Sequence, residues 1–297
     1  MLRFLTAGES HGPCLTAIVD GVPAGLDLNI EAVNCDLARR QGGYGRGGRM
    51  KIEHDRVEVL GGVIAGATTG APLSLRIANR DWANWQARWA GGDLPKLTVP
   101  RPGHADYAGM MKYGLDDARP VLERASARET AARVAVGAVA KQLLAIAGIA
   151  VGSYVTEIGG ERANLPDLPT DALWACAEAS DVRCPDDEAG ARMRAAIDAA
   201  REAGDSLGGV FVVTATGAPV GLGSHTQWDR RLDARLAQAV MSIQAIKGVE
   251  IGPAFANARR PGTQVHDAFA RDDAGSVTRL TNRAGGIEGG MSNGMPI

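Results

Sequence analysis

Two histidines stand in short glycine-containing segments, where an imidazole could exchange protons with a bound ligand. His11 lies in the segment Gly-Glu-Ser-His-Gly at 8–12, and Ser10 beside it can donate or accept a hydrogen bond. His104 ends the segment Arg-Pro-Gly-His, close to the fixed positive charge of Arg101. Because imidazole titrates near neutral pH, both segments are candidates for acid–base chemistry. The alternative for each histidine, taken alone, is a structural role.

An arginine- and glycine-rich segment at 39–50 could bind an anion. It reads Arg-Arg-Gln-Gly-Gly-Tyr-Gly-Arg-Gly-Gly-Arg-Met, with four arginines interleaved among five glycines. Glycine lets a ligand approach the backbone, and guanidinium groups bind phosphate or carboxylate through paired hydrogen bonds. A solvated loop and an RNA-binding arginine–glycine segment are the alternatives. The segment is short and lies between predicted globular elements, which favours a small anion over nucleic acid.

The most apolar helix must help to hold these segments in place. Ser126 followed by Glu129 forms a capping-box pattern, an alanine-rich apolar run covers 131–147, and Gly148 is a typical helix end. Few positions of this run suit water, so we expect a central, buried helix. The helix dipole disfavours cations in the first turns, yet three arginines lie in or beside them: Arg124, Arg128 and Arg133. They predict either an anion bound among them or pairing with nearby acidic residues.

Short strands and further helices surround that helix. Apolar and alternating runs predict strands at 2–6, 15–19, 57–64, 72–77, 149–158 and 210–216. Longer periodic runs predict helices at 28–40, 171–179, 186–203 and 228–242. Another helical segment carries a tryptophan stripe on one face: Trp82, Trp85 and Trp89. Such a stripe is more often part of a core or a subunit interface than of a ligand site, so we expect an anchoring role.

Composition excludes several classes of protein. The chain has 297 residues and a formal net charge of -2, which argues against a general binder of nucleic acid or membrane surfaces. Its four cysteines show neither metal-site nor disulfide-scaffold spacing, which favours a reducing intracellular compartment and no metal. No apolar run approaches the length that spans a membrane. Two further histidines have no recognisable catalytic neighbours and are expected to be structural: His225 and His266.

A glycine-rich stretch at 282–294 closes the sequence. It contains Gly-Gly-Ile-Glu-Gly-Gly-Met-Ser-Asn-Gly, a composition that forms neither a stable helix nor a good strand. Backbone of this kind suits a surface on which a flat ligand lies. The last residues, 295–297, begin what looks like a strand, so we expect the sequence to be cut short.

Several of these motifs together resemble the chorismate synthase family. They are 8–12, the arginine–glycine segment, Arg101–His104, the 123–135 segment around Arg-Ala-Ser-Ala-Arg-Glu-Thr, Ser-Ile-Gln-Ala-Ile-Lys-Gly at 242–248, and 285–294. Each motif alone is weak, but their joint order over the whole chain is specific. The resemblance implies an α+β fold, with long central helices packed between antiparallel sheets and an internal pseudo-repeat. It also implies one domain at 1–297.

The reaction implied by the resemblance is the anti-1,4-elimination of phosphate from 5-enolpyruvylshikimate-3-phosphate, which gives chorismate. This carbon–oxygen lyase reaction uses reduced FMN without net redox change. Some relatives reduce their flavin with NADPH, but no extra reductase domain is recognisable here, so we expect an external reductant. A homotetramer in the cytoplasm is also implied.

The resemblance assigns roles to individual residues. His11 resembles the donor of a proton to the leaving phosphate, His104 the residue that protonates reduced flavin near N1, and Ser10 part of a relay from flavin N5. The basic residues implied in substrate binding are Arg40, Arg46, Arg49, Arg101 and Arg128. The residues implied in cofactor binding are Arg124, Ala125, Ser126, Gln244, Ala245 and Gly289.

The sequence departs from the family pattern after 297. The family continues with a Lys-Pro-rich flavin loop and an Arg-His-Asp-like motif, and neither occurs in these residues. We therefore expect a C-terminally incomplete version of the family fold with weak or no activity in isolation. A catalytically incomplete scaffold and a nucleic-acid binder built on the arginine–glycine segment are the alternative functions.

Overall fold

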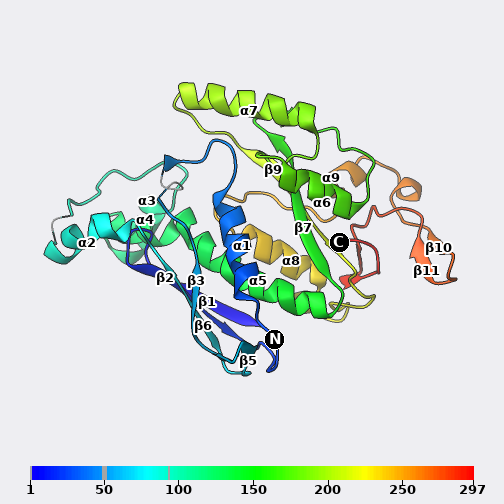
Figure 1. Cartoon of the computed structure of the whole chain (residues 1–297). Helices are drawn as coiled ribbons and strands as arrows, with labels where there is room; N and C mark the ends of the chain where they lie inside the picture. The colour runs from blue at the N-terminus through cyan, green and yellow to red at the C-terminus, as the bar shows by residue number, and fades with distance from the viewer. Residues whose placement is uncertain (1, 49–51, 93) are drawn as a thin grey trace. The chain divides into compact units, whose positions relative to one another are not determined.

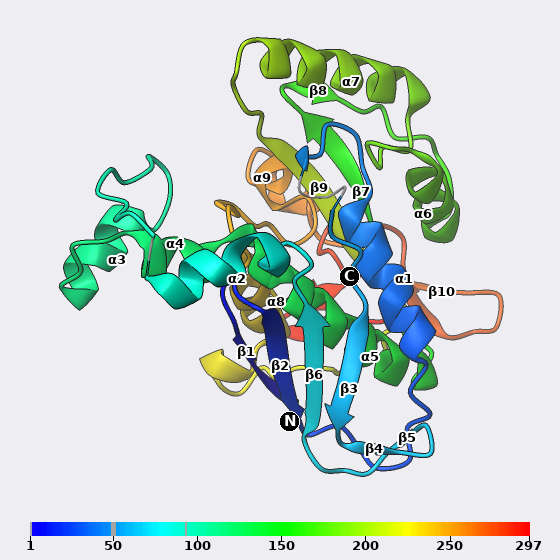
Figure 2. The same ribbon diagram turned by 60° about the vertical axis from the view of Figure 1, so that its left-hand side comes forward.

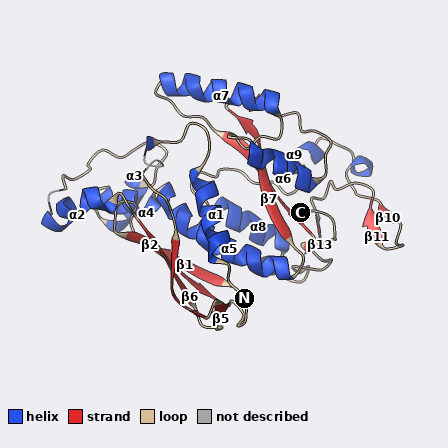
Figure 3. Cartoon of the chain, in the orientation of Figure 1, coloured by secondary structure: helices blue, strands red, loops and turns tan. Residues whose placement is uncertain are grey.

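The computed structural model describes residues 2–48, 52–92 and 94–297. Arg49, which is predicted to bind the substrate, lies outside the described residues. The chain divides into two compact units, Met1–Leu143 and Leu144–Ile297, and each is described by itself. Both units combine helices with antiparallel strands (Figure 3). The α+β prediction is therefore confirmed, while the assignment of one domain to 1–297 stays a prediction.

The first unit is built on an antiparallel sheet with the strand order β1-β2-β6-β3. These strands are β1 (Arg3–Ala7), β2 (Cys14–Asp20), β6 (Leu73–Ala78) and β3 (Val57–Gly61). A separate hairpin pairs β4 (Val63–Ile64) with β5 (Ala67–Thr68). Alternate residues of the two central strands are buried, as expected for a sheet with one face on a core: Leu15, Ala17, Val19, Leu73, Leu75 and Ile77.

Two helices, α1 (Ile30–Gln41) and α5 (Thr130–Ile146), cover one face of this sheet (Figure 2). Small residues of α5 allow the close approach, and the buried ones are Ala131, Ala132, Ala135, Val136, Ala138 and Val139. The prediction of a buried central helix is confirmed for this face. The shorter helices α2 (Trp82–Gly91), α3 (Asp106–Tyr113) and α4 (Arg119–Ala125) complete the unit.

The start of α5 differs from the capping-box prediction. Ser126 accepts a hydrogen bond from the backbone N–H of Arg128, 3.2 Å away, and so caps the 3-10 turn η2 (Ala127–Glu129). The Glu129 carboxylate does not close the box, because it accepts hydrogen bonds from Thr6 Oγ1 at 2.6 Å and from Arg133 Nε at 2.8 Å. Tertiary partners therefore displace the local motif, and α5 begins four residues later than the sequence pattern suggests.

The second unit contains a three-stranded sheet with the order β8-β7-β9. Its strands are β7 (Ala150–Ile158), β8 (Glu161–Arg162) and β9 (Gly209–Thr216), and α6 (Thr170–Ala179) packs on β7. Trp174 donates from Nε1 to Thr214 Oγ1 at 2.8 Å, and a Cβ on Gly152 would lie 2.3 Å from the indole. The helix α7 (Asp187–Glu202) is capped by Asp186, as the predicted helix at 186–203 requires.

The rest of this unit consists of short elements, coloured yellow to red in Figure 1. The predicted helix at 228–242 is interrupted at Arg231, whose extended backbone separates η3 (Trp228–Arg230) from α8 (Leu232–Met241). Beyond it lie α9 (Ala254–Asn257), η4 (Gly262–Gln264), and the hairpins of β10 (Phe269–Arg271) with β11 (Val277–Arg279) and β12 (Ile287–Glu288) with β13 (Met291–Ser292).

Candidate active site

His11 is held by a buried carboxylate from a distant helix. It lies in the loop after β1, and Glu123 lies near the end of α4. The imidazole Nδ1 is 2.9 Å from Glu123 Oε1 and 3.1 Å from Oε2, and the His11 backbone N–H donates to Oε2 at 2.8 Å. The Glu123 side chain is 1% exposed and that of His11 23%. Since an ionised carboxylate only accepts, Nδ1 carries the hydrogen and Nε2 is the nitrogen left for a ligand.

The charge of Glu123 follows from these contacts. Burial raises the pKa of its carboxyl group, but the hydrogen bonds from His11 outweigh burial and hold that pKa below its ordinary value. Glu123 is therefore ionised at neutral pH. The ionised carboxylate accepts the hydrogen bond from Nδ1–H, which leaves Nε2 as the nitrogen that can exchange a proton with a ligand.

Ser10 is buried beside His11 and accepts a hydrogen bond from Ser126 Oγ at 3.1 Å. Its backbone N–H donates to the Glu123 carbonyl at 3.2 Å. Gly8, which precedes them, has φ +106°, and a Cβ there would lie 2.3 Å from the carbonyl oxygen of Cys14. Only glycine fits that turn without strain, so the loop brings Ser10 and His11 to the ends of α4 and η2.

A buried polar network anchors the same loop to the sheet. The side-chain amide of Asn79 donates to three loop carbonyls: Glu9 at 3.1 Å, Ser10 at 3.3 Å and Gly12 at 2.8 Å. Arg128 donates from Nε to Asn79 Oδ1 at 3.0 Å and bonds Asp55 through both terminal nitrogens at 2.7 Å. The Arg128 side chain is 2% exposed. This placement makes Arg128 an internal anchor of the His11 loop and leaves it little surface for a ligand.

The other predicted substrate arginines of the first unit differ in exposure. Arg40 donates to Thr130 Oγ1 at 2.9 Å and to the Ala127 carbonyl at 3.0 Å, and it lies 3.7 Å from Asp55. Arg46 is exposed and donates from Nε to the Gly42 carbonyl. Arg40 therefore points towards the protein interior, and Arg46 points towards solvent.

His104 forms a second histidine–carboxylate pair. Its Nδ1 contacts Oδ1 of Asp106, whose side chain is 1% exposed. Arg101 donates to Asp106 Oδ2 from its backbone N–H and from Nε, both at 3.1 Å, and its Nη2 lies 3.0 Å from His104 Nδ1. Burial raises the pKa of Asp106, but the hydrogen bonds from Arg101 and His104 outweigh it, so that pKa is lowered. Arg101 and His104 thus lie together around the buried Asp106 carboxylate.

The residues assigned to the cofactor in the first unit lie where α4 meets η2. Arg124 donates from Nη2 to the Thr6 carbonyl at 2.8 Å and to Thr6 Oγ1 at 2.7 Å, while 44% of its side chain stays exposed. Ser126 is hydrogen-bonded to Ser10. Ala125 lies between Arg124 and Ser126 in the sequence. The cation-rich start of α5 is thus neutralised partly by protein groups, because Arg128 and Arg133 pair with Asp55 and Glu129.

The remaining predicted cofactor residues belong to the second unit. Gln244 is partly buried, and Ala245 is exposed with φ +67°, in the left-handed region. Gly289 is exposed with φ +59° and has open space where a Cβ would stand, whereas a Cβ on Gly290 would meet Arg231 at 2.8 Å. Of these two glycines, Gly290 is therefore needed for internal packing and Gly289 presents bare backbone.

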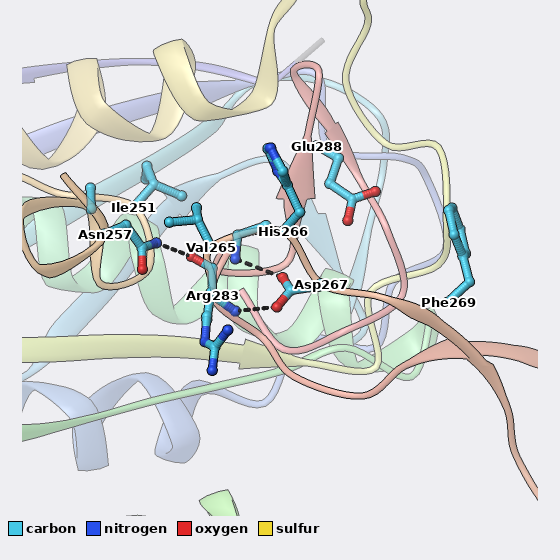
Figure 4. Close-up of a pocket in the computed structure, with 10 residues that line it drawn as sticks. Ile251, Asn257, Val265, His266, Asp267, Phe269, Arg283 and Glu288 are labelled. Carbon is cyan, nitrogen blue, oxygen red and sulfur yellow. Dashed lines mark hydrogen bonds between the residues drawn. The ribbon is translucent and has the colours of Figure 1, made fainter. Parts of the chain in front are cut away.

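The second unit also contains a cavity of about 510 Å³, shown in Figure 4. It is lined by Ile251, Ala254, Asn257, Val265, His266, Asp267, Phe269, Arg283, Ala284 and Glu288. None of the predicted site residues is among them. Asp267 accepts hydrogen bonds from Thr281 Oγ1 and from the backbone N–H groups of Arg283 and Ala284, both at 2.8 Å. The sequence predicts a structural role for His266 and carries no signal of this cavity.

Sequence reasoning also missed the partners of both histidines. Asp106 follows His104 by two residues, so its proximity could have been suspected. Glu123 is separated from His11 by 112 positions, and its only signal is that it is the first residue of the 123–135 segment. Asn79, whose amide organises the loop, carries no sequence signal of that role.

Two general findings concern the described residues. Within 2–48, 52–92 and 94–297, no group of three or more His, Cys, Asp and Glu side chains is arranged to hold a metal ion. Across the same ranges, the helices are too short or too polar for any of them to cross a membrane.

Comparison with known proteins identifies the family. The sequence profile described as Chorismate synthase matches residues 2–297. Chorismate synthase of Geobacter metallireducens is 57% identical over 309 aligned positions that cover 100% of this chain and 79% of the relative. The enzyme of Desulforudis audaxviator is 56% identical and is covered to 77%. A chorismate synthase crystal structure superposes with a TM-score of 0.86 at 48% identity, over 100% of this chain and 82% of the other. The chain belongs to the chorismate synthase family and has the function of a chorismate synthase, a lyase.

Proposed function

We propose that the chain eliminates phosphate from 5-enolpyruvylshikimate-3-phosphate in the presence of reduced FMN, and that His11 donates a proton to the departing phosphate. The observation that carries this proposal is the His11–Glu123 pair. The buried carboxylate binds Nδ1 and the backbone N–H of the same residue. A cationic imidazole in this arrangement presents Nε2–H, the atom that a phosphate oxygen would meet.

We assign the remaining substrate-binding roles from the exposure and the contacts of each arginine. Arg46 and Arg101 are exposed and would bind the anionic groups of the substrate, where their positive charge stabilises the negative charge of a leaving phosphate. The family resemblance adds Arg49. Arg40 and Arg128 act mainly from within, through Thr130 and Asp55, by holding the surrounding loops.

The residues that the family resemblance assigns to FMN are taken here unit by unit. Arg124 offers a half-exposed guanidinium group, and Gly289 offers open backbone. The further residues assigned to it are Ala125, Ser126, Gln244 and Ala245. When bound, reduced flavin would supply electron density for the loss of phosphate and accept hydrogen from the substrate. His104 would hold a proton for the flavin edge near N1, and the Ser10 hydroxyl, paired with Ser126, would pass one from N5.

The family resemblance supplies the rest of the proposal. Reduced flavin comes from an external reductant, and the protein works as a homotetramer in the cytoplasm. Sedimentation of the purified chain would measure the oligomeric state. A nucleic-acid function has less support, because Arg40 of the arginine–glycine segment bonds Thr130 and Ala127 instead of extending from the surface.

The decisive experiment replaces His11 with alanine. We expect kcat to fall by about 10²–10⁴-fold, the usual contribution of a general acid, with the affinity for reduced FMN unchanged. Phosphate release under anaerobic conditions measures turnover, and flavin titration measures binding. His225→Ala is the matched control, since His225 is exposed in the second unit. Normal turnover of His11→Ala would remove His11 from the mechanism.

A further inference from the structure

The indole of Trp85 lies against the imidazole of His11. The two ring centroids are 4.3 Å apart and the ring planes are inclined by 38°. Trp85 belongs to α2, and its Nε1 donates to Asp81 Oδ2 at 3.2 Å, a bond that fixes the rotation of the indole. The other two tryptophans of the stripe pack on each other, with Trp82 and Trp89 centroids 5.9 Å apart. Trp85 therefore has a partner that its neighbours on the helix do not share.

Trp85 and Glu123 constrain the imidazole in different directions. Glu123 binds the ring edge at Nδ1, while Trp85 covers part of one ring face. An edge contact alone leaves the ring free to tilt about the Nδ1 bond, and a face contact restricts that tilt. An aromatic face also stabilises a neighbouring cation. The two contacts together define where Nε2 points.

We propose that Trp85 is a positioning residue for His11, and that its fluorescence reports the protonation of that imidazole. The proposal rests on the proposed role of His11 as proton donor. Misplacing a reacting group by about 1 Å can cost on the order of 10²-fold in rate, so loss of the face contact should lower turnover without removing the proton donor itself.

Several charged groups surround this pair and contribute to its pH response. Glu123 and Arg119 lie on α4, and Glu9 lies on the loop of His11. From α2, the Arg88 guanidinium lies 5.5 Å from the Trp85 ring centroid, and Asp81 bonds the indole nitrogen. A pH-dependent signal that is lost when His11 is replaced therefore points to this imidazole and not to the charged groups around it.

The first test measures turnover of Trp85→Ala and Trp85→Phe. We expect Trp85→Ala to lower kcat by about 10-fold or more while KM and the affinity for reduced FMN change less than about twofold. Trp85→Phe should recover most of the rate, because phenyl restores a face contact. Trp89→Ala on the same helix is the control and should keep the wild-type rate. An unchanged kcat in Trp85→Ala, or an equal loss in Trp89→Ala, would overturn the proposal.

The second test uses tryptophan fluorescence of the full chain without added flavin. A protonated imidazole quenches a neighbouring indole, so emission should decrease when acid protonates the His11 ring that Trp85 contacts. That decrease should disappear in Trp85→Phe and in His11→Gln and persist in Trp89→Phe. A decrease that survives in Trp85→Phe would contradict the contact. If the decrease behaves as expected while His11→Ala turns over normally, the contact stands and the proton-donor role fails.

Discussion

The two histidine–carboxylate pairs share their chemistry and differ in how they are built. In both pairs the carboxylate is 1% exposed and contacts Nδ1 of a partly exposed imidazole. Glu123 reaches His11 across 112 positions of sequence, whereas Asp106 reaches His104 across two. The first pair therefore exists only when β1 and α4 have folded together, and the second is formed within one loop and the start of a helix.

The supporting contacts follow the same division. The His11 loop is bound by Asn79, which is in turn bound by Arg128 and through it by Asp55. His104 is supported from within its own segment, since Arg101 bonds Asp106 and lies against the imidazole. The geometry of His11 therefore depends on the stability of the whole first unit, and that of His104 on one local arrangement.

The largest expected effect is the loss of stability of the first unit in Arg128→Ala. Removal of one partner from a buried ion pair typically costs about 3–5 kcal/mol, because the buried Asp55 carboxylate loses both of its hydrogen bonds from Arg128 and keeps the more distant Arg40, at 3.7 Å. Urea unfolding monitored by circular dichroism measures this change. Lys141→Ala on α5, the helix that follows η2, is the control: its pair with Asp36 is partly exposed, so we expect a loss of about 1 kcal/mol or less. Equal losses in the two variants would show that the network does not support the unit.

The next largest effect is expected when the two carboxylates are replaced one at a time. Glu123→Gln replaces the carboxylate that accepts from His11 Nδ1, and we expect kcat to fall by about 10²-fold. Asp106→Asn should cost about 10-fold, since Arg101 still contacts the His104 ring. Anaerobic phosphate release measures both rates. A larger loss in Asp106→Asn than in Glu123→Gln would reverse the proposed ranking of the two pairs.

Sequence periodicity predicted most elements, because alternation in β2 and apolar runs in α5 report burial directly. Residue type also selected His11 and His104 as candidates, and the structure pairs each imidazole with a buried carboxylate. It could not place Arg128, because arginine is normally exposed and its inward direction depends on Asp55, 73 positions away. The same limit applies to Trp85. Its stripe was recognised as an anchor, but the imidazole that it contacts lies in a distant loop.

The start of α5 shows why a local sequence motif can predict the wrong contacts. Ser126 and Glu129 form a capping box by sequence, yet Thr6 and Arg133 bind the Glu129 carboxylate in the folded unit. A local motif predicts a structure only while its side chains have no better partner. At this position the better partner comes from β1, the strand that leads into the His11 loop.

The smallest expected effect is on stability in acid, where the two histidine–carboxylate pairs differ through the charges of Glu123 and Asp106. The pKa values of Glu123 and Asp106 are both lowered in the folded protein, from ordinary values of 4.5 and 3.8. Each carboxylate therefore contributes stability that is fully present above its ordinary pKa and is lost as pH falls through the folded value.

Urea unfolding at a series of pH values between about 6 and 3 should give a shallower acid loss in Glu123→Gln than in wild type. Because the ordinary pKa of Glu123 is the higher, its contribution should begin to disappear first, and Asp106→Asn should change only the more acidic end of the curve. An acid loss in Glu123→Gln as steep as that of wild type would show that the buried carboxylate is not preferentially ionised in the folded state.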